Sequence, residues 1–369
     1  GGGLGMYYTA YIGPPLPDDE FAAAATDKLA LPGPNGDFHN SPYQYHLVFG
    51  QYGRGFTGLD RQVSRKDLAT VQVDYSGEGT GRIGFKNAIG LFGGTLGFSR
   101  PISFDLPFRS TEYYLASPDL TWRNMFDVYI PGPVWDVPQA YFEQTTTYQP
   151  QHNYREQWGY PVFTPASPQV QQTRDELYVR LPLHSDGAGH QGDPATAQGT
   201  AKLYRNDTLI ATRDDVIQVW AYVPPDRATY RVEVDATRDA DLSIRQTGSW
   251  TFHAEDNPAT RTTTTLPAVR FWPNVDAYGN APAGREYLIP VTVGGLASGV
   301  EVDQLTVDIS YDDGKTWQPA RINRSGANRW NAQVRHPGGG GFVSLRATVT
   351  DTAGNSGTHA TIRAYRLQA

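Results

Sequence analysis

Residues 263–369 carry short apolar runs that alternate with polar residues and are separated by turn residues, and this pattern constrains the fold more than any other feature. A period of two places the apolar side chains on one face of a strand. Seven such runs in about 105 residues are what an immunoglobulin-like or fibronectin type III-like sandwich requires. The expected strands are Val269–Trp272, Glu286–Val293, Gln304–Ser310, Thr316–Ile322, Arg329–Val334, Val343–Thr350 and Thr361–Arg366.

A turn motif lies between the third and fourth of these runs. Residues 310–317 match the pattern S-x-D-x-G-x-T-W, which is called an Asp-box. We expect a hairpin turn in which the carboxylate accepts hydrogen bonds from backbone N–H groups and the glycine adopts a positive φ. The tryptophan is expected to return the chain to the core. The residues that define the motif are Ser310, Asp312, Gly314, Thr316 and Trp317.

Glycine and proline are spread over the whole chain and leave little room for long helices. The 369 residues include 39 Gly and 27 Pro, more than a typical globular protein contains. The helix-like window is Glu20–Leu31, which ends at Pro32-Gly33. We therefore predict an all-β protein made of tandem β-sandwiches, of which the last two are immunoglobulin-like or fibronectin type III-like.

Composition divides the chain into three predicted domains. Residues 1–165 are rich in Tyr and Gly and are expected to form a β domain of sandwich or jelly-roll type. Residues 166–262 show turn signals about every 8–12 residues, which is typical of a β-sandwich. Residues 263–369 form the last sandwich with the Asp-box. The proline-rich segment 160–168 is interpreted as the linker between the first two domains.

Charge and cysteine content exclude several classes of partner and chemistry. The formal net charge of −7 argues against a nucleic-acid partner, which needs a clustered basic face. No apolar run reaches the roughly 18 residues of a membrane-spanning helix. Without cysteine, disulfides, Cys-ligated zinc and a thiol nucleophile are excluded. Residues 1–5 do not resemble a signal peptide, so the chain is interpreted as a piece of a longer precursor or as a mature product.

Two short motifs have an alternative interpretation as ligand sites. Residues 79–84 match G-x-G-x-x-G, but a strand-like run follows instead of the helix that a dinucleotide site needs. His184, Asp186, His190 and Asp193 lie close together in sequence and could hold zinc or calcium. Their spacing matches no metal motif, so a polar loop is favoured. We predict no cofactor, and calcium stays an alternative that no motif indicates.

The chain contains no recognisable catalytic set. The G-x-S-x-G elbow of α/β-hydrolases is absent from the sequence. A single Asp-box without repeats of blade length does not make a sialidase-like propeller. We therefore assign no catalytic, cofactor-binding or metal-binding residue.

Aromatic residues favour a second functional interpretation. Sugars stack on exposed aromatic faces, and the candidate surface aromatics are Trp122, Trp135 and Trp158. Aromatic side chains in small β domains more often belong to the core, because each buries a large area. A carbohydrate- or cell-surface-binding module of an extracellular enzyme is therefore the alternative function.

Several segments in this order along the chain resemble the C-terminal non-catalytic β-domain region of secreted, subtilisin-like serine peptidases of actinobacteria such as Streptomyces. The resemblance covers about residues 105–369. The segments include Arg109–Tyr114, Tyr154–Trp158, Leu181–His190, Ala268–Phe271, Ser310–Trp317 and Thr350–Asn355. The H-G-T-H, D-[ST]-G and G-T-S-M-A segments of the family's peptidase domain are absent here.

The resemblance implies that the chain is the accessory region of a secreted serine endopeptidase. It would stabilise, orient or target a peptidase domain that lies N-terminal to it in the same precursor. The expected partners are that peptidase domain and, beyond it, a protein substrate or a polysaccharide surface. The expected location is extracellular.

Overall fold

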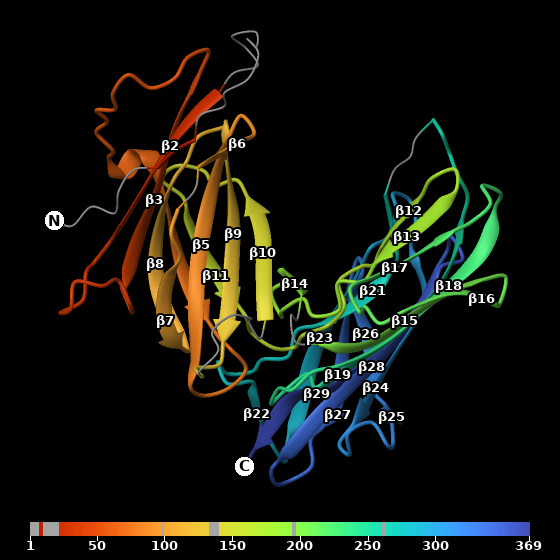
Figure 1. Ribbon diagram of the computed structural model, residues 1–369. Helices are drawn as coiled ribbons and strands as arrows, with labels where there is room; N and C mark the ends of the chain where they lie inside the picture. Colours follow the sequence, from red (N-terminus) through yellow and green to blue (C-terminus); the bar gives the residue numbers. More distant parts are fainter. Residues whose placement is uncertain (1–6, 10–21, 98, 133–139, 194–196, 260–262) are drawn as a thin grey trace. The chain divides into compact units, whose positions relative to one another are not determined.

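The computed structural model describes residues 7–9, 22–97, 99–132, 140–193, 197–259 and 263–369 (Figure 1). In these ranges regular structure is almost entirely β, and the helical part is one 3-10 turn at Arg65–Asp67. None of the described helical structure has the length and hydropathy of a membrane span. The chain groups into two compact units, Gly1–Gly159 and Tyr160–Ala369, which are described separately. The all-β prediction is confirmed.

The first unit is a β-sandwich. One sheet has the strand order β1-β2-β3-β8-β4-β11, and the other has the order β10-β9-β5-β6 with β7 beside β5. Aromatic rings join the two sheets: the Tyr75 ring lies 4.6 Å from Phe104 and 4.9 Å from Phe126 between centroids. The strands are β1 (Tyr7–Thr9), β2 (Ala22–Ala30), β3 (Tyr43–Tyr52), β4 (Leu68–Tyr75), β5 (Arg82–Phe92), β6 (Thr95–Gly97), β7 (Ile102–Leu106), β8 (Phe108–Leu115), β9 (Leu120–Tyr129), β10 (Ala140–Thr146) and β11 (Asn153–Trp158).

The expectation of helix in the window Glu20–Leu31 is wrong, because its described part forms strand β2. The strand pairs antiparallel with β3, from Ala22 opposite Tyr52 to Ala30 opposite Gln44. Of the alanines that suggested a helix, Ala23, Ala24 and Ala25 are buried within this strand. Pairing with a neighbouring strand therefore overrides their local helix propensity.

The second unit holds two sandwiches. In the first of them, β12 and β13 pair beside β17 and face the sheet β16-β15-β18-β19 across a closed apolar core. The helical content is nil in this part of the described chain. The strands are β12 (Gln169–Gln172), β13 (Glu176–Arg180), β14 (Gln191–Asp193), β15 (Gln198–Arg205), β16 (Thr208–Arg213), β17 (Gln218–Tyr222), β18 (Ala228–Thr237), β19 (Arg245–Ala254) and β20 (Thr264–Thr265).

The last sandwich has the immunoglobulin strand order. Its sheet β21-β23-β27-β26 matches strands A-B-E-D, and β24-β28-β29 matches C-F-G. Each of the seven expected strands has a counterpart, and the fourth is divided into β25 and β26. The strands are β21 (Ala268–Phe271), β22 (Asn280–Pro282), β23 (Glu286–Gly294), β24 (Val302–Ser310), β25 (Gln318–Pro319), β26 (Arg321–Gly326), β27 (Arg329–Arg335), β28 (Gly341–Asp351) and β29 (Ser356–Gln368). The prediction of tandem sandwiches with immunoglobulin-like or fibronectin type III-like C-terminal members is confirmed.

One nine-stranded sheet runs through both sandwiches of the second unit (Figure 1). Strand β19 of the first sandwich pairs antiparallel with β29 of the last, from Arg245 opposite Ile362 to Thr251 opposite Ser356. The boundaries at 165/166 and 262/263 stay predictions. The structure adds that the last two predicted domains share a hydrogen-bonded sheet.

The proline-rich segment 160–168 is not an exposed linker. Val162 and Phe163 are buried in the second unit. The carbonyl oxygen of Phe163 accepts hydrogen bonds from Gln246 Nε2 at 2.7 Å and from Thr361 Oγ1 at 3.1 Å. Because its two apolar side chains fill space beside the shared sheet, the segment belongs to the core of this unit.

Candidate functional site

The turn at residues 310–317 is held by its own polar side chains. Asp312 Oδ1 accepts hydrogen bonds from Thr316 N at 2.9 Å and from Ser310 Oγ at 2.8 Å. Thr316 Oγ1 donates to Asp312 Oδ2 at 2.7 Å, and Gly314 N donates to Ser310 Oγ at 2.9 Å. The hydrogen bonds from Thr316 and Ser310 lower the pKa of Asp312 from 3.8 to about 2. Both oxygens of the Asp312 carboxylate therefore accept hydrogen bonds that close the turn.

Gly314 is required at its position for two reasons. Its φ is 80°, in the left-handed region that favours glycine. A Cβ on this residue would also lie 2.8 Å from Ile362 Cδ1 and 3.2 Å from the Trp317 ring. Both expectations for the turn, a positive φ and backbone donors to the carboxylate, therefore hold in the geometry.

The expectation that the Trp317 side chain enters the core is wrong. It is half-buried, and the Arg346 guanidinium lies over its ring at 4.6 Å from the centroid. The ring lies against the turn, since a Cβ added at Gly314 would come within 3.2 Å of it. A second contact was not predicted: Arg363 donates twice to the Asp313 carboxylate, at 2.9 and 2.7 Å.

In the loop at residues 184–190, the Asp186 carboxylate binds backbone N–H groups of the same loop. Asp186 Oδ2 lies 2.8 Å from His190 Nδ1, and Asp186 Oδ1 accepts from the N–H groups of Ala188 and His190 at 3.1 and 2.9 Å. His184 is buried, which, together with the nearby Arg238 charge, holds its pKa well below the usual value. Among the described side chains, no group of three or more His, Asp or Glu is arranged to hold a metal. The Asp193 side chain lies outside the described set.

The structure contradicts the predicted surface exposure of two of the three candidate tryptophans. Trp122 and Trp158 are 1% and 0% exposed. Trp122 Nε1 donates to the carbonyl oxygen of Leu115 at 2.9 Å, and Trp158 Nε1 donates to Glu156 Oε2 at 3.0 Å. Their strand positions point between the two sheets, where the rings bury large apolar areas. Trp135 lies outside the described residues.

A cluster of buried polar side chains, here called the core polar cluster, lies between the sheets of the first unit. Lys86 on β5, Glu112 on β8 and Asn124 on β9 are each at most 1% exposed. Lys86 Nζ donates to Asn124 Oδ1 at 2.6 Å and lies 3.4 Å from Glu112 Oε2. An ammonium, a carboxylate and a carboxamide therefore meet in a water-excluded core.

Aromatic hydroxyls and an imidazole surround the carboxylate of the cluster. Tyr75 and Tyr114 both donate their hydroxyls to Glu112, and His46 Nε2 lies 3.2 Å from Glu112 Oε2. Burial pushes the pKa of Glu112 upward, but the Lys86 charge and the hydrogen bonds outweigh it and hold the pKa well below its usual range. Burial lowers the pKa of His46 to about 3, so the imidazole is neutral at pH 7.

A second lysine and a hydrogen-bonded arm extend the cluster. Lys28 Nζ donates to the carbonyl oxygens of Lys86 and Arg100, at 3.4 and 3.0 Å. Burial and the Lys86 charge lower the pKa of Lys28 to about 7. On the other side, Asn124 Nδ2 donates to the Tyr148 hydroxyl at 3.3 Å, and that hydroxyl donates to a half-buried glutamate, Glu156, at 2.7 Å.

Sequence reasoning missed the core polar cluster, although a signal was available. On β9 the inward positions alternate as Trp122, Asn124 and Phe126, so a polar amide occupies an apolar register. On β5 Lys86 lies between inward-facing Gly84 and Ala88 in the same way. A polar residue at a core position of an alternating strand predicts a buried partner, but not which one.

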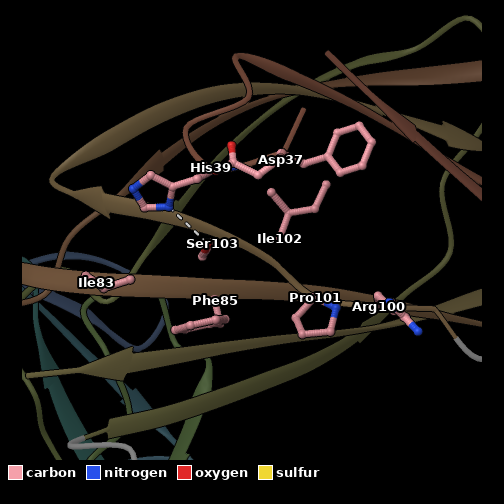
Figure 2. A pocket seen from close by; sticks show the side chains of 9 residues that line it. Asp37, His39, Ile83, Phe85, Arg100, Pro101, Ile102 and Ser103 are labelled. Carbon is pink, nitrogen blue, oxygen red and sulfur yellow. Dashed lines mark hydrogen bonds between the residues drawn. The ribbon is translucent and has the colours of Figure 1, made fainter. Parts of the chain in front are cut away.

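A surface hollow of about 480 Å³ lies in the same unit, where β7 and the 37–40 loop meet (Figure 2). Phe85, Pro101 and Ile102 form much of its apolar wall. At its rim His39 Nδ1 lies 2.9 Å from Ser103 Oγ, and His39 Nε2 lies 3.4 Å from Asp105 Oδ1. The order Ser–His–Asp is that of an activated serine, so nucleophilic chemistry is an alternative interpretation of this hollow.

Comparisons with known proteins give no family. No protein-family model matches the chain, and no curated protein matches it. Fibronectin type III-like modules of CbhA from Clostridium thermocellum share 12% identity over 53% of this chain and 85% of theirs, with a TM-score of 0.19. A chimeric titin Z1Z2 tandem shares 17% identity over 56% of this chain and 100% of its own, with a TM-score of 0.19. Titin immunoglobulin domains A164-A165 share 11% identity over 56% and 97%, with a TM-score of 0.16.

The fold assignment therefore rests on the chain's own strands and their order. The sandwiches of the second unit are of the immunoglobulin and fibronectin type III kind. The low TM-scores carry no argument about function.

Proposed function

We propose that this chain is the non-catalytic accessory region of a secreted, subtilisin-like serine peptidase, and that it orients or stabilises the peptidase domain. The observation that supports an orienting role is the nine-stranded sheet of the second unit. A tandem of separate sandwiches bends at the linker between them. Here seven residue pairs join β19 to β29, so residues 160–369 act as one rigid body. The order of motifs along residues 105–369 supports the peptidase as the partner.

The rim of the hollow in Figure 2 fits a structural role better than a catalytic one. The Asp105 side chain is 68% exposed and that of His39 is 35% exposed, so water screens both groups. Catalytic electrostatics depend on a dry site in which charges are not screened. Asn40 also binds this segment, because its Oδ1 accepts from Asp105 N at 2.8 Å and its Nδ2 donates to Asp105 Oδ2 at 3.0 Å. The side chains together fasten the 37–40 loop to β7.

A fluorophosphonate probe tests the non-catalytic assignment directly. We expect no labelling of the full chain and no cleavage of casein, with the Ser103→Ala variant indistinguishable from the unchanged protein. Labelling that maps to Ser103 and disappears in Ser103→Ala would show an activated serine and overturn the assignment. Active subtilisin serves as the positive control for the probe.

The link to a peptidase has a separate test. The reading frame upstream of Gly1 is expected to encode D-[ST]-G, H-G-T-H and G-T-S-M-A segments in that order. In the enzyme so identified, removal of this chain should speed heat inactivation while the isolated peptidase domain keeps its activity on a small peptide. An upstream frame without those segments would remove the peptidase from the proposal.

A further inference from the structure

We infer that Lys86 and Asn124 of the core polar cluster join through an intramolecular amide bond between their side chains, with Glu112 as the group that moves the protons. The inference concerns a covalent modification of the first unit. It is independent of the proposed orienting role, which rests on the shared sheet of residues 160–369.

The two reacting side chains are placed on neighbouring strands by the pairing of β5 with β9. Lys86 lies opposite Phe126 and Ala88 lies opposite Asn124, so Lys86 and Asn124 are diagonal neighbours on the inner face. The Lys86 Nζ atom is 2.6 Å from Asn124 Oδ1, which brings the nitrogen close to the carboxamide carbon. Groups held in this way react as if at very high concentration, because the entropy of bringing them together has already been lost in folding.

The surroundings protect the amide. Lys86, Glu112 and Asn124 are 1%, 0% and 1% exposed, so water has little access to the site. The Lys86 Nζ atom lies 5.6 Å from the centre of the Tyr114 ring and 5.7 Å from that of Trp158. Because water has little access to the site, hydrolysis of the product is suppressed.

The reaction balances with the groups present. The Glu112 carboxylate takes one proton from the Lys86 ammonium, which leaves a neutral amine and a carboxylic acid and removes two buried charges. The amine lone pair then forms a bond to Asn124 Cγ, and the Tyr114 hydroxyl, which lies 2.8 Å from Asn124 Oδ1, hydrogen-bonds the oxygen where negative charge develops. A second proton of the amine passes through Glu112 to Nδ2, the Cγ–Nδ2 bond breaks, and ammonia leaves. The net change is an amine and a carboxamide giving a secondary amide and ammonia, with no oxidant or reductant.

The hydroxyl groups around Glu112 act as positioning groups. Tyr75 and Tyr114 donate to its two carboxylate oxygens and fix the carboxylate beside the lysine, with Oε2 3.4 Å from Lys86 Nζ. The amide bond would tie β5 to β9 within one sheet, close to the centre of the sandwich. This explains why charged groups occupy a core where apolar residues of similar volume would pack at lower cost.

Intact-mass measurement of the full chain tests the inference. We expect a mass below the sequence mass by one ammonia, about 17 Da. In a tryptic digest the linked Lys86 resists cleavage, so residues 83–109 should appear joined to residues 124–155. The location matters because a succinimide at Asn35-Gly36 would release the same mass within a different peptide.

Three variants and a matched control complete the test. Lys86→Ala and Asn124→Ala should each restore the full mass, and Glu112→Gln should restore it with both reacting groups still in place. Asn87→Ala is the control, because Asn87 is the neighbour of Lys86 on β5 but binds Ser99 at 2.7 Å instead of the cluster. It should keep the linked mass.

The unchanged protein decides the question even if a variant fails to fold. A full sequence mass in the folded, unchanged chain, or an ammonia loss that maps outside the two joined peptides, overturns the inference. A link that persists in Glu112→Gln overturns the role given to Glu112.

Discussion

At the scale of single residues, two groups of charged side chains in this protein lie in contrasting environments. Asp312 and Asp186 lie in turns and accept hydrogen bonds from groups a few residues away. Glu112 and Lys86 lie between two sheets and meet partners that are far away in sequence. The first kind can be anticipated from local pattern, because the donors belong to the same turn. The second kind requires the fold.

Substitution of Asp312 should weaken the last sandwich. Asp312→Ala leaves the N–H of Thr316 and the hydroxyls of Ser310 and Thr316 without their acceptor, and we expect the Tm to fall by on the order of 2–4 °C at pH 7. Differential scanning calorimetry measures it. Asp303→Ala, an exposed aspartate on β24, is the matched control and should leave the Tm unchanged.

The effect of Asp312 should depend on pH with a definite sign. Its pKa is about 2 in the folded chain and 3.8 ordinarily, so the carboxylate stabilises the fold above pH 3.8 and this contribution is lost as the pH falls through about 2. The Tm difference between the unchanged protein and Asp312→Ala should therefore narrow on acidification. A difference that stays constant down to pH 2 would contradict the assignment of these hydrogen bonds to the charged form.

At the scale of elements, the decisive feature is the pairing of β19 with β29. Trp250 of β19 is fully buried, and its Nε1 donates to the carbonyl oxygen of Pro267 at 3.0 Å. Gly357 of β29 lies opposite Trp250 in the register. A Cβ at Gly357 would come within 2.6 Å of the indole and 2.9 Å of that same carbonyl oxygen. The glycine is therefore what lets the two strands approach around the indole.

Gly357→Ala should destabilise the second unit by roughly 1–3 kcal/mol, because an added methyl group in a filled core displaces its neighbours. Urea unfolding followed by tryptophan fluorescence measures the change. Gly338→Ala is the control, since a Cβ there meets nothing within 4 Å. Equal stability of the two variants would show that the contact between β19 and β29 tolerates the added methyl group.

At the scale of the whole molecule, the chain consists of two compact units. The last two of the three predicted domains belong to the same unit. Residues 160–369 share a single sheet, and the buried segment around Phe163 joins both sandwiches through Gln246 and Thr361. A fragment of residues 160–369 should therefore unfold in one cooperative transition. We expect the calorimetric and van't Hoff enthalpies of that fragment to agree. Two resolved transitions would mean that the shared sheet does not couple the sandwiches.

The sequence by itself determined the all-β class, the strands of residues 263–369 and the turn at 310–317. Each of these depends on neighbours within about ten residues, through side-chain alternation or turn chemistry. Only the tertiary structure decided that Glu20–Leu31 contributes a strand, that Trp122 and Trp158 are buried, and that β19 continues into β29. It also brought together Lys86, Glu112 and Asn124, because contacts between strands far apart in sequence depend on sheet order and register, which local patterns do not encode.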